Sequence, residues 1–213
     1  MVASAGGASG PLPRAAEALL AFWFGGEPLV GEALGERMRT WFSVDPAFDA
    51  ELRARFEPLV RMAAAGALDT WAASPRGRLA LILLLDQLPR NLYRGEPRAF
   101  ATDAQALAWT LSGMDAGLDR ALPPIERTFF YMPMQHAEDL GVQERGVAVF
   151  EALAREAPPA LRPALGDNAA YAVLHRDLIA RFGRFPHRNR ALARATTADE
   201  EKALTEGGAR FGQ

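Results

Sequence analysis

The stretch SPRGRLALILLLDQLPRNLYRG, residues 74–95, decides the fold of this chain of 213 residues. It opens with Ser74 and Pro75, a helix start signal in which serine caps the helix and proline occupies the first turn. The segment that follows, up to Leu85, is apolar on most faces, so we expect it to be the central, most buried helix. Pro89 lacks a backbone N–H and clashes with the turn before it, which predicts that the helix ends or bends near residues 86–88.

Helical periodicity continues outward from this stretch in both directions. Apolar residues recur at steps of three and four, whereas alternating strand patterns with hairpin turns are absent from the sequence. We therefore expect an all-α fold of about eight or nine helices, joined by short loops and stacked as antiparallel hairpins. The expected helices cover about 14–24, 32–43, 75–88, 124–131, 137–156, 167–182 and 197–207, with two more that begin at 45 and at 102 or 103.

Prolines and apolar spacing predict further details of these helices. Pro58 lies inside the third helix and should kink it. Pro133 should break the chain, so that His136 enters the helix that follows. The apolar side chains expected on inward faces are Leu140, Val147, Phe150 and Leu153 on one helix, and Tyr171, Leu174, Leu178, Ile179 and Phe182 on the next.

The helices are expected to form one domain, residues 14–213, after a disordered tail, residues 1–13, that is small, polar and glycine-rich. Thr197 and Glu200 form a capping box at the start of the last helix, which Gly207 should end. The apolar run LALILLLDQL is far shorter than the roughly 20 residues of a membrane span, and no signal peptide pattern is found. We therefore expect a cytoplasmic protein without a membrane partner.

Composition excludes several classes of function. The chain has no cysteine, which rules out disulfides, thiolate zinc sites and a cysteine nucleophile. Its formal net charge of −2 argues against broad electrostatic binding to nucleic acid. A glycine-rich phosphate loop, a His-Glu-x-x-His helix, a nucleophile elbow and a calcium loop are all absent.

A first polar stretch interrupts the apolar pattern at Asp86, Arg90 and Asn91. Asp86 follows five apolar residues and lies near a helix C-terminus, where the helix dipole disfavours a carboxylate. A buried carboxylate needs a cation and hydrogen bonds, which Arg90, Arg94 or an arginine from elsewhere must supply. The alternative to a functional site is a structural ion pair that closes the helix end.

A second polar stretch contains His136, Glu138 and Asp139. Acidic residues in the first turn of a helix are favourable, so the two acids need no functional explanation. His136 could cap the helix, or it could face inward near Tyr131.

The third stretch is RFGRFPHRN, residues 181–189, preceded by His175 on an apolar helix face. Gly183 is a natural helix stop, so cations just beyond it are favoured by the helix dipole. Arginine is abundant throughout, since Lys202 is the only lysine, and this lowers the weight of any arginine cluster. The polar residues beyond the stop are nevertheless dense: Arg184, His187, Arg188 and Asn189.

The three histidines of the chain all lie in these three stretches, which we expect to meet in space. A shared pocket would combine carboxylates, imidazoles and arginines. Arginine forks recognise carboxylate or phosphate groups, and histidine beside a carboxylate can serve acid–base chemistry. The spacing fits no metal-ligand pattern and the arginines disfavour a cation, so we expect neither a metal nor another cofactor.

These motifs also carry a family resemblance. LALILLLDQLPRNLYRG, FFYMPMQHAEDL and HRDLIARFGRFPHRN followed by TADEEKAL resemble the bacterial family known as domain of unknown function 924, as do FWFG and LDTWAASPRGRLA. The resemblance extends from about residue 17 to 211 and implies a tetratricopeptide-like helical fold, but no activity. Ala137 and Ala193 depart from the pattern, where the family usually has serine and often has glycine. The family segments fall on Asp86, Gln87, Arg90 and Asn91, on His136, Glu138 and Asp139, and on Arg184, Phe185, Pro186, His187, Arg188 and Asn189.

Three functions fit these features. The favoured one is an interaction module, in which an Arg/His/Asp-lined groove of the helical stack holds a peptide or protein partner. The second is a site that binds a small anionic molecule, with or without His–carboxylate catalysis. The third is that the motifs are purely structural. Catalytic residues, ligand identity and oligomeric state stay open.

Overall fold

The computed structural model describes residues 11–26 and 29–205, and within these ranges every regular element is a helix. The α-helices are α1 (Arg14–Phe24), α2 (Gly31–Phe42), α3 (Pro46–Ala64), α4 (Pro75–Leu85), α5 (Gln87–Leu92), α6 (Asp103–Asp115), α7 (Pro124–Gln135), α8 (Leu140–Glu156), α9 (Arg162–Phe182) and α10 (Ala198–Thr205). The short 3-10 helices are η1 (Asp69–Ala73), η2 (Pro97–Ala99), η3 (Leu118–Ala121) and η4 (Pro186–Arg188). The predicted all-α fold is confirmed.

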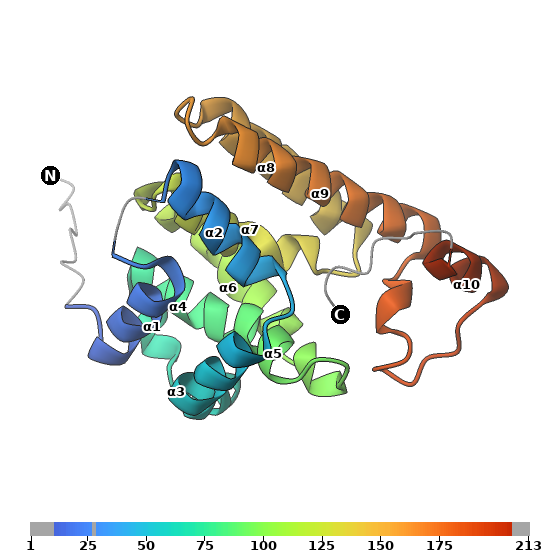
Figure 1. Cartoon of the computed structure of the whole chain (residues 1–213), viewed down its shortest axis with the longest axis horizontal. Helices are drawn as coiled ribbons and strands as arrows, with labels where there is room; N and C mark the ends of the chain where they lie inside the picture. The colour runs from blue at the N-terminus through green and yellow to red at the C-terminus, as the bar shows by residue number, and fades with distance from the viewer. Residues whose placement is uncertain (1–10, 27–28, 206–213) are drawn as a thin grey trace, which may run out of the picture.

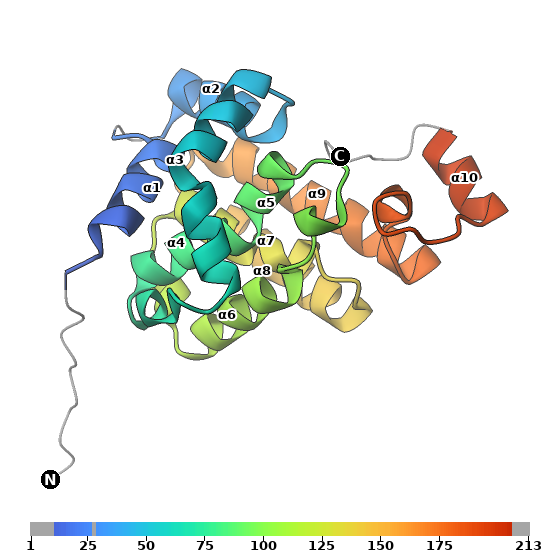
Figure 2. The same ribbon diagram turned by 90° about the horizontal axis from the view of Figure 1, so that it is seen from below.

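Helix α4 lies at the centre, as its sequence predicts. All side chains from Leu79 to Leu85 are at most 1% exposed. Helices α1, α3, α6 and α7 pack around α4, which Figure 2 shows among its neighbours. Burial of a helix on all faces removes a large apolar area from water. Each Å² of this area stabilises the folded state by about 25 cal/mol.

A bend at Asp86 separates α4 from α5. Asp86 has φ −116° and ψ −59°, and its N–H still donates to the carbonyl oxygen of Ile82 at 2.9 Å. Pro89 then lies in the first turn of α5, where its missing N–H is not needed. With α4 and α5 counted as one bent helix, the described residues form nine α-helices, in agreement with the expected eight or nine.

Caps predicted from the sequence fix several helix starts. The Asp45 carboxylate accepts hydrogen bonds from the N–H groups of Ala47 and Phe48 at 2.9 and 3.1 Å. The Ser74 hydroxyl accepts one from Gly77 N–H at 3.2 Å. Each such cap contributes about 1 kcal/mol to helix stability.

One proline prediction is wrong. Helix α7 continues through Pro133 to Gln135, so His136 ends this helix instead of entering the next one. Helix α3 runs through Pro58 to Ala64, as expected for a helix with an internal proline, and the kink at Pro58 stays a prediction. A proline inside a helix removes one backbone hydrogen bond, and tertiary packing can offset this loss.

The predicted inward faces of α8 and α9 are confirmed for Phe150, Leu153 and Ile179, which are at most 3% exposed, but are wrong for three other residues. Leu140, Tyr171 and Leu174 are 41%, 54% and 47% exposed, not inward-facing. Helix α9 begins at Arg162, five residues before its predicted start, and buries Ala169 and Ala172 in addition to the predicted Ile179. Small residues let two helix backbones approach closely, and α9 packs along most of α8 (Figure 1).

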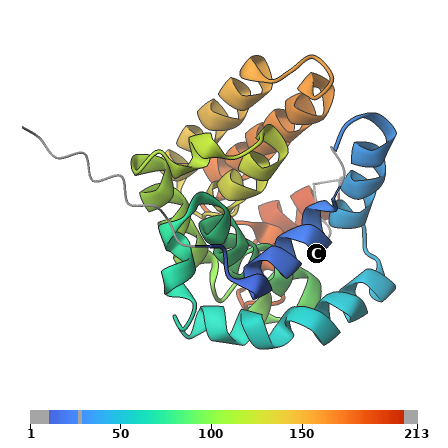
Figure 3. The same ribbon diagram turned by 90° about the vertical axis from the view of Figure 1, so that its left-hand side faces the viewer.

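The segment after α9 folds back towards the middle of the chain. Gly183, at φ +67°, ends α9 in the left-handed conformation that the sequence predicts. Figures 1 and 3 show α8 and α9 as a pair beside the α1–α7 part, and Figure 1 shows α10 beyond the end of α9. The predicted end of the last helix at Gly207, and residues 1–10 of the predicted tail, lie outside the described residues. Among the described helices, none combines the length and apolarity of a membrane span.

Candidate functional site

The Asp86 carboxylate lies at the α4–α5 bend and is fully buried. Its Oδ1 is 2.6 Å from Nδ1 of His136 and 3.2 Å from Nη1 of Arg90. Its Oδ2 accepts a hydrogen bond from Nε2 of Gln87 at 2.5 Å. The first two predicted stretches, 50 residues apart in sequence, therefore meet at this one carboxylate.

Asp86 is ionised at neutral pH. Burial favours the neutral acid, but Arg90 and His136 outweigh it and hold the pKa of Asp86 well below its usual value. Burial, followed by the charge of Arg90, lowers the pKa of His136. A neutral imidazole beside an ionised carboxylate must donate from Nδ1, which leaves the lone pair on Nε2.

Asp103 joins the third stretch to the first. Nη1 and Nη2 of Arg90 donate to the two Asp103 carboxylate oxygens at 2.9 Å each, a bidentate pair. Nη1 of Arg188 donates to Oδ2 of the same carboxylate at 3.1 Å, across 85 residues of sequence. The sequence interpretation treated Asp103 only as a possible helix start, since nothing local marks it as a shared counter-ion.

Arg188 is held between two aromatic rings. Its guanidinium carbon is 4.7 Å from the centre of the Phe100 ring and 4.5 Å from that of Phe185. Burial, followed by the charge of Arg90, lowers the pKa of Arg188 to about 10, so it stays charged at neutral pH. Its Nε is buried and has no hydrogen-bond partner among the described residues. A buried charged donor without a partner is costly.

The histidines form a row of rings with Phe185. Ring centres are 6.1 Å apart for His136 and His175, 5.6 Å for His175 and Phe185, and 5.4 Å for Phe185 and His187. Nδ1 of His175 donates to the Tyr171 carbonyl oxygen at 2.8 Å. Burial lowers the pKa of both His175 and His187 to about 3, so these rings are neutral at neutral pH.

Glu138 lies at the border of this cluster. Its Oε1 accepts a hydrogen bond from the N–H of Phe185 at 2.8 Å, and both oxygens bind Arg194 at 2.7 and 3.0 Å. Although burial opposes ionisation, Arg194 and the Phe185 N–H lower the pKa of Glu138. Glu138 thereby fastens the turn after α9 to the segment after α7.

Arg184 and Asn189 hold α10 in place. Arg184 binds both oxygens of Glu200 at 2.6 and 2.9 Å, and the Asn189 amide donates to Glu200 at 3.2 Å. Glu200 also accepts from the N–H of Thr197 at 2.8 Å, which confirms the predicted capping box. These two members of the third stretch therefore have a structural role that accounts for them.

Two predicted site residues lie elsewhere. Asn91 donates to Asp49 on α3 at 2.8 Å. The Asp139 carboxylate caps α8 by accepting from the N–H of Val142 at 2.9 Å. The predicted residues that the fold does bring together in the cluster are Asp86, Arg90, His136, His175, His187 and Arg188.

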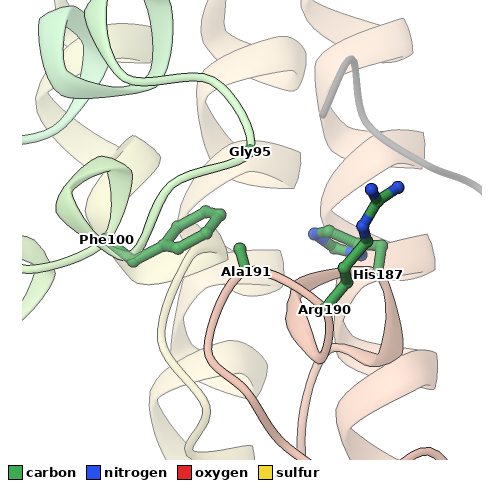
Figure 4. Close-up of a pocket in the computed structure, with 5 residues that line it drawn as sticks. All are labelled: Gly95, Phe100, His187, Arg190 and Ala191. Atoms are coloured by element: carbon green, nitrogen blue, oxygen red, sulfur yellow. The ribbon is translucent and has the colours of Figure 1, made fainter.

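A pocket with a volume of about 370 Å³ adjoins the cluster. Figure 4 shows Phe100 reaching into it from one segment and His187, Arg190 and Ala191 from the facing turn. Phe100 and Arg190 were not predicted: Phe100 lies in a loop without a polar motif, and Arg190 is one arginine among many. The lining consists of Gly95, Phe100, His187, Arg190 and Ala191.

Comparisons with known proteins agree with the sequence resemblance. A family model described as a bacterial protein of unknown function (DUF924) matches residues 19–208. The chain is also similar to a solved structure of a protein of unknown function from Agrobacterium tumefaciens, with 37% identity and a TM-score of 0.75. This similarity covers 90% of the chain and 97% of the other protein. No curated protein matches significantly. Neither similarity names a ligand or a reaction.

Proposed function

We propose that this chain, which belongs to the DUF924 family of bacterial proteins of unknown function, binds a small molecule that carries an anionic group. The family has no known ligand, so the proposal rests on the site alone. The ligand occupies the pocket between the segment around Phe100 and the turn that contains Arg190. A volume of about 370 Å³ falls within the range of small-molecule sites.

Arg190 carries this proposal, because its exposed side chain lines the pocket. Arg188, which is 5% exposed, adds positive charge behind the pocket residue Phe100. Guanidinium groups with unused donors bind carboxylate and phosphate groups through charge-assisted hydrogen bonds.

Charge balance supports an anionic ligand. Within the cluster, the carboxylates of Asp86 and Asp103 balance the positive charges of Arg90 and Arg188. Arg190, exposed at the pocket, adds a positive charge that has no carboxylate partner among the described residues. An anion in the pocket would neutralise it.

The peptide groove and the purely structural role stay predictions. The pocket geometry favours a compact ligand over an extended peptide. The many pairs inside the cluster support a structural contribution as well, but they do not account for Arg190 or for Nε of Arg188.

Thermal unfolding with defined probes tests the proposal: sodium phosphate, sodium benzoate and AMP, each up to 20 mM. At a concentration of about 100 times its Kd, a ligand of the folded state adds about 2.7 kcal/mol of stability. We expect a saturable rise in Tm with at least one probe. Arg190→Gln should reduce the rise without a change in the Tm of the unliganded protein.

Arg145→Gln is the matched control, because Arg145 is exposed on α8 and contacts only Asp115, at 3.3 Å, among the partners that the structure describes. It should keep the full ligand response. Equal responses of the Arg190→Gln and Arg145→Gln proteins, or no response to any probe, would overturn the proposal.

A further inference from the structure

We propose that the outward face of α9 is the contact surface of a homodimer, in which α9 of one protomer packs antiparallel against α9 of a second copy of the chain. The outward face consists of five side chains that are exposed or half-buried: Asp167, Tyr171, Leu174, Leu178 and Arg181. This inference concerns assembly and does not depend on the pocket or on an anionic ligand.

Helix α9 carries apolar side chains on two sides, and the fold buries only one of them. Ala172 and Ile179 are at most 3% exposed on the side that packs against α8 and α7, whereas Tyr171 and Leu174 are 54% and 47% exposed. A single exposed apolar residue is normal on a protein surface. Tyr171, Leu174 and Leu178 follow one another at steps of three and four residues, so they form a continuous strip along α9, at the edge of the molecule in Figure 1.

The charges on the outward face are placed symmetrically about Leu174. Asp167 lies seven residues before Leu174 and Arg181 lies seven residues after it, so each is about 10 Å from Leu174 along the helix axis. Both side chains are exposed. Asp177, at the edge of the face, already binds Arg176 of the same helix at 2.6 Å. The outward face therefore has a negative end and a positive end at equal distances from its middle.

A two-fold axis at Leu174 pairs all five side chains of the outward face. In a symmetric dimer of this kind, a residue before the axis meets the residue that lies equally far after the axis in the second copy. Leu174 then meets its own copy, and Asp167 lies opposite Arg181 of the second copy. Tyr171 and Leu178 are seven residues apart and share one flank of the helix, so Tyr171 packs against Leu178 of the second copy.

The order of the charges favours the antiparallel arrangement. A parallel pair of α9 helices would place Asp167 beside Asp167 and Arg181 beside Arg181, and like charges that face each other in an interface cost several kcal/mol. The antiparallel pair instead contains two attractive charge pairs around an apolar centre. The contact of one helix pair is at the low end of the area that a stable dimer buries, about 1,200–2,000 Å². We therefore expect a reversible dimer with a Kd on the order of 10 µM.

Sedimentation equilibrium of the full chain, between about 1 and 500 µM, tests the inference. The mass should rise with concentration from the 23.1 kDa of one chain towards twice this value. Leu174→Glu brings two carboxylates together at the two-fold axis and should raise the Kd at least about 100-fold. Met62→Glu is the matched control, because Met62 is 44% exposed on α3, away from α9 in Figure 1. It should keep the wild-type Kd.

Exchange of the two charges tests the antiparallel pairing. Asp167→Arg places an arginine opposite Arg181 of the second copy, and Arg181→Asp places an aspartate opposite Asp167. Each change should raise the Kd at least about tenfold. The double variant, Asp167→Arg with Arg181→Asp, restores both attractive pairs and should return the Kd to within about threefold of wild type. This recovery would show that the single changes act through the interface and not through the fold.

Three results would each overturn the inference. The first is a wild-type chain that stays monomeric at about 500 µM, which would leave the outward face of α9 to a different partner. The second is a Leu174→Glu protein that dimerises as strongly as the Met62→Glu protein. The third is a double charge variant that dimerises as weakly as the two single variants.

Discussion

Replacement of His175 by leucine should make the protein less sensitive to acid. His175 is 6% exposed on α9, and burial, followed by the charge of His136, lowers its pKa to about 3. In the unfolded chain the same group takes up a proton near pH 6.5. Below pH 6.5 the unfolded state therefore binds more protons than the folded state, and the free energy of unfolding falls as pH falls.

The size of the effect follows from the two pKa values. The stabilisation from a neutral His175 is fully present above pH 6.5 and is lost progressively as pH falls toward about 3. The shift of the His175 pKa from 6.5 to about 3 lowers the free energy of unfolding by about 5 kcal/mol between these two pH values, since one pKa unit is about 1.4 kcal/mol. Between pH 8 and pH 5 the loss from this one group is about 2 kcal/mol.

Urea unfolding of wild type and His175→Leu at pH 8 and pH 5 measures this difference. The variant loses the hydrogen bond from His175 to the Tyr171 carbonyl, about 1 kcal/mol, and this loss is the same at both pH values. The pH-dependent part should be smaller in the variant by about 2 kcal/mol. Carboxylates that titrate in this range affect both proteins alike. The same decrease from pH 8 to pH 5 in both proteins would refute the reasoning.

Four further changes test the packing and the backbone of the fold. Asp103→Asn removes the counter-ion that two buried arginines share, so urea unfolding should show a loss of about 3 kcal/mol. In Gly113→Ala the new methyl group would lie 2.6 Å from the Phe130 ring, which should cost roughly 1–3 kcal/mol. Gly166→Ala has open space and should stabilise α9 by roughly 0.5–1 kcal/mol in the same assay. Ala193→Gly should raise Tm, because Ala193 has φ +51°, which costs an alanine about 1 kcal/mol; an unchanged Tm would contradict this strain.

The left-handed Ala193 gives a physical reason for a departure noted in the sequence. The family pattern often has glycine at this position, and glycine adopts positive φ without the steric cost of a Cβ atom. The sequence alone shows only that the residue differs. The backbone angle shows what the difference costs.

Local signals determined most helix boundaries because they act within one turn. Asp45 and Ser74 cap their helices, and Gly183 ends α9, through contacts with residues at most a few positions away. Where the sequence interpretation of helices was wrong, as at Pro133, packing from distant segments outweighed a local preference. Tyr171 and Leu174 are exposed for a similar reason, because the helices that pack against α9 determine which of its faces is buried.

The sequence by itself determined that Asp86 is buried and needs a partner. A helix that is apolar on most faces lies in the core together with its last residues, and a carboxylate there needs a cation or hydrogen bonds. Only the tertiary structure decided which partners it has. His136 lies 50 residues away along the chain, and the Asp103–Arg188 pair spans 85. Helical periodicity records which face of a helix is apolar over a few turns, but contacts between distant segments depend on how all the helices pack together.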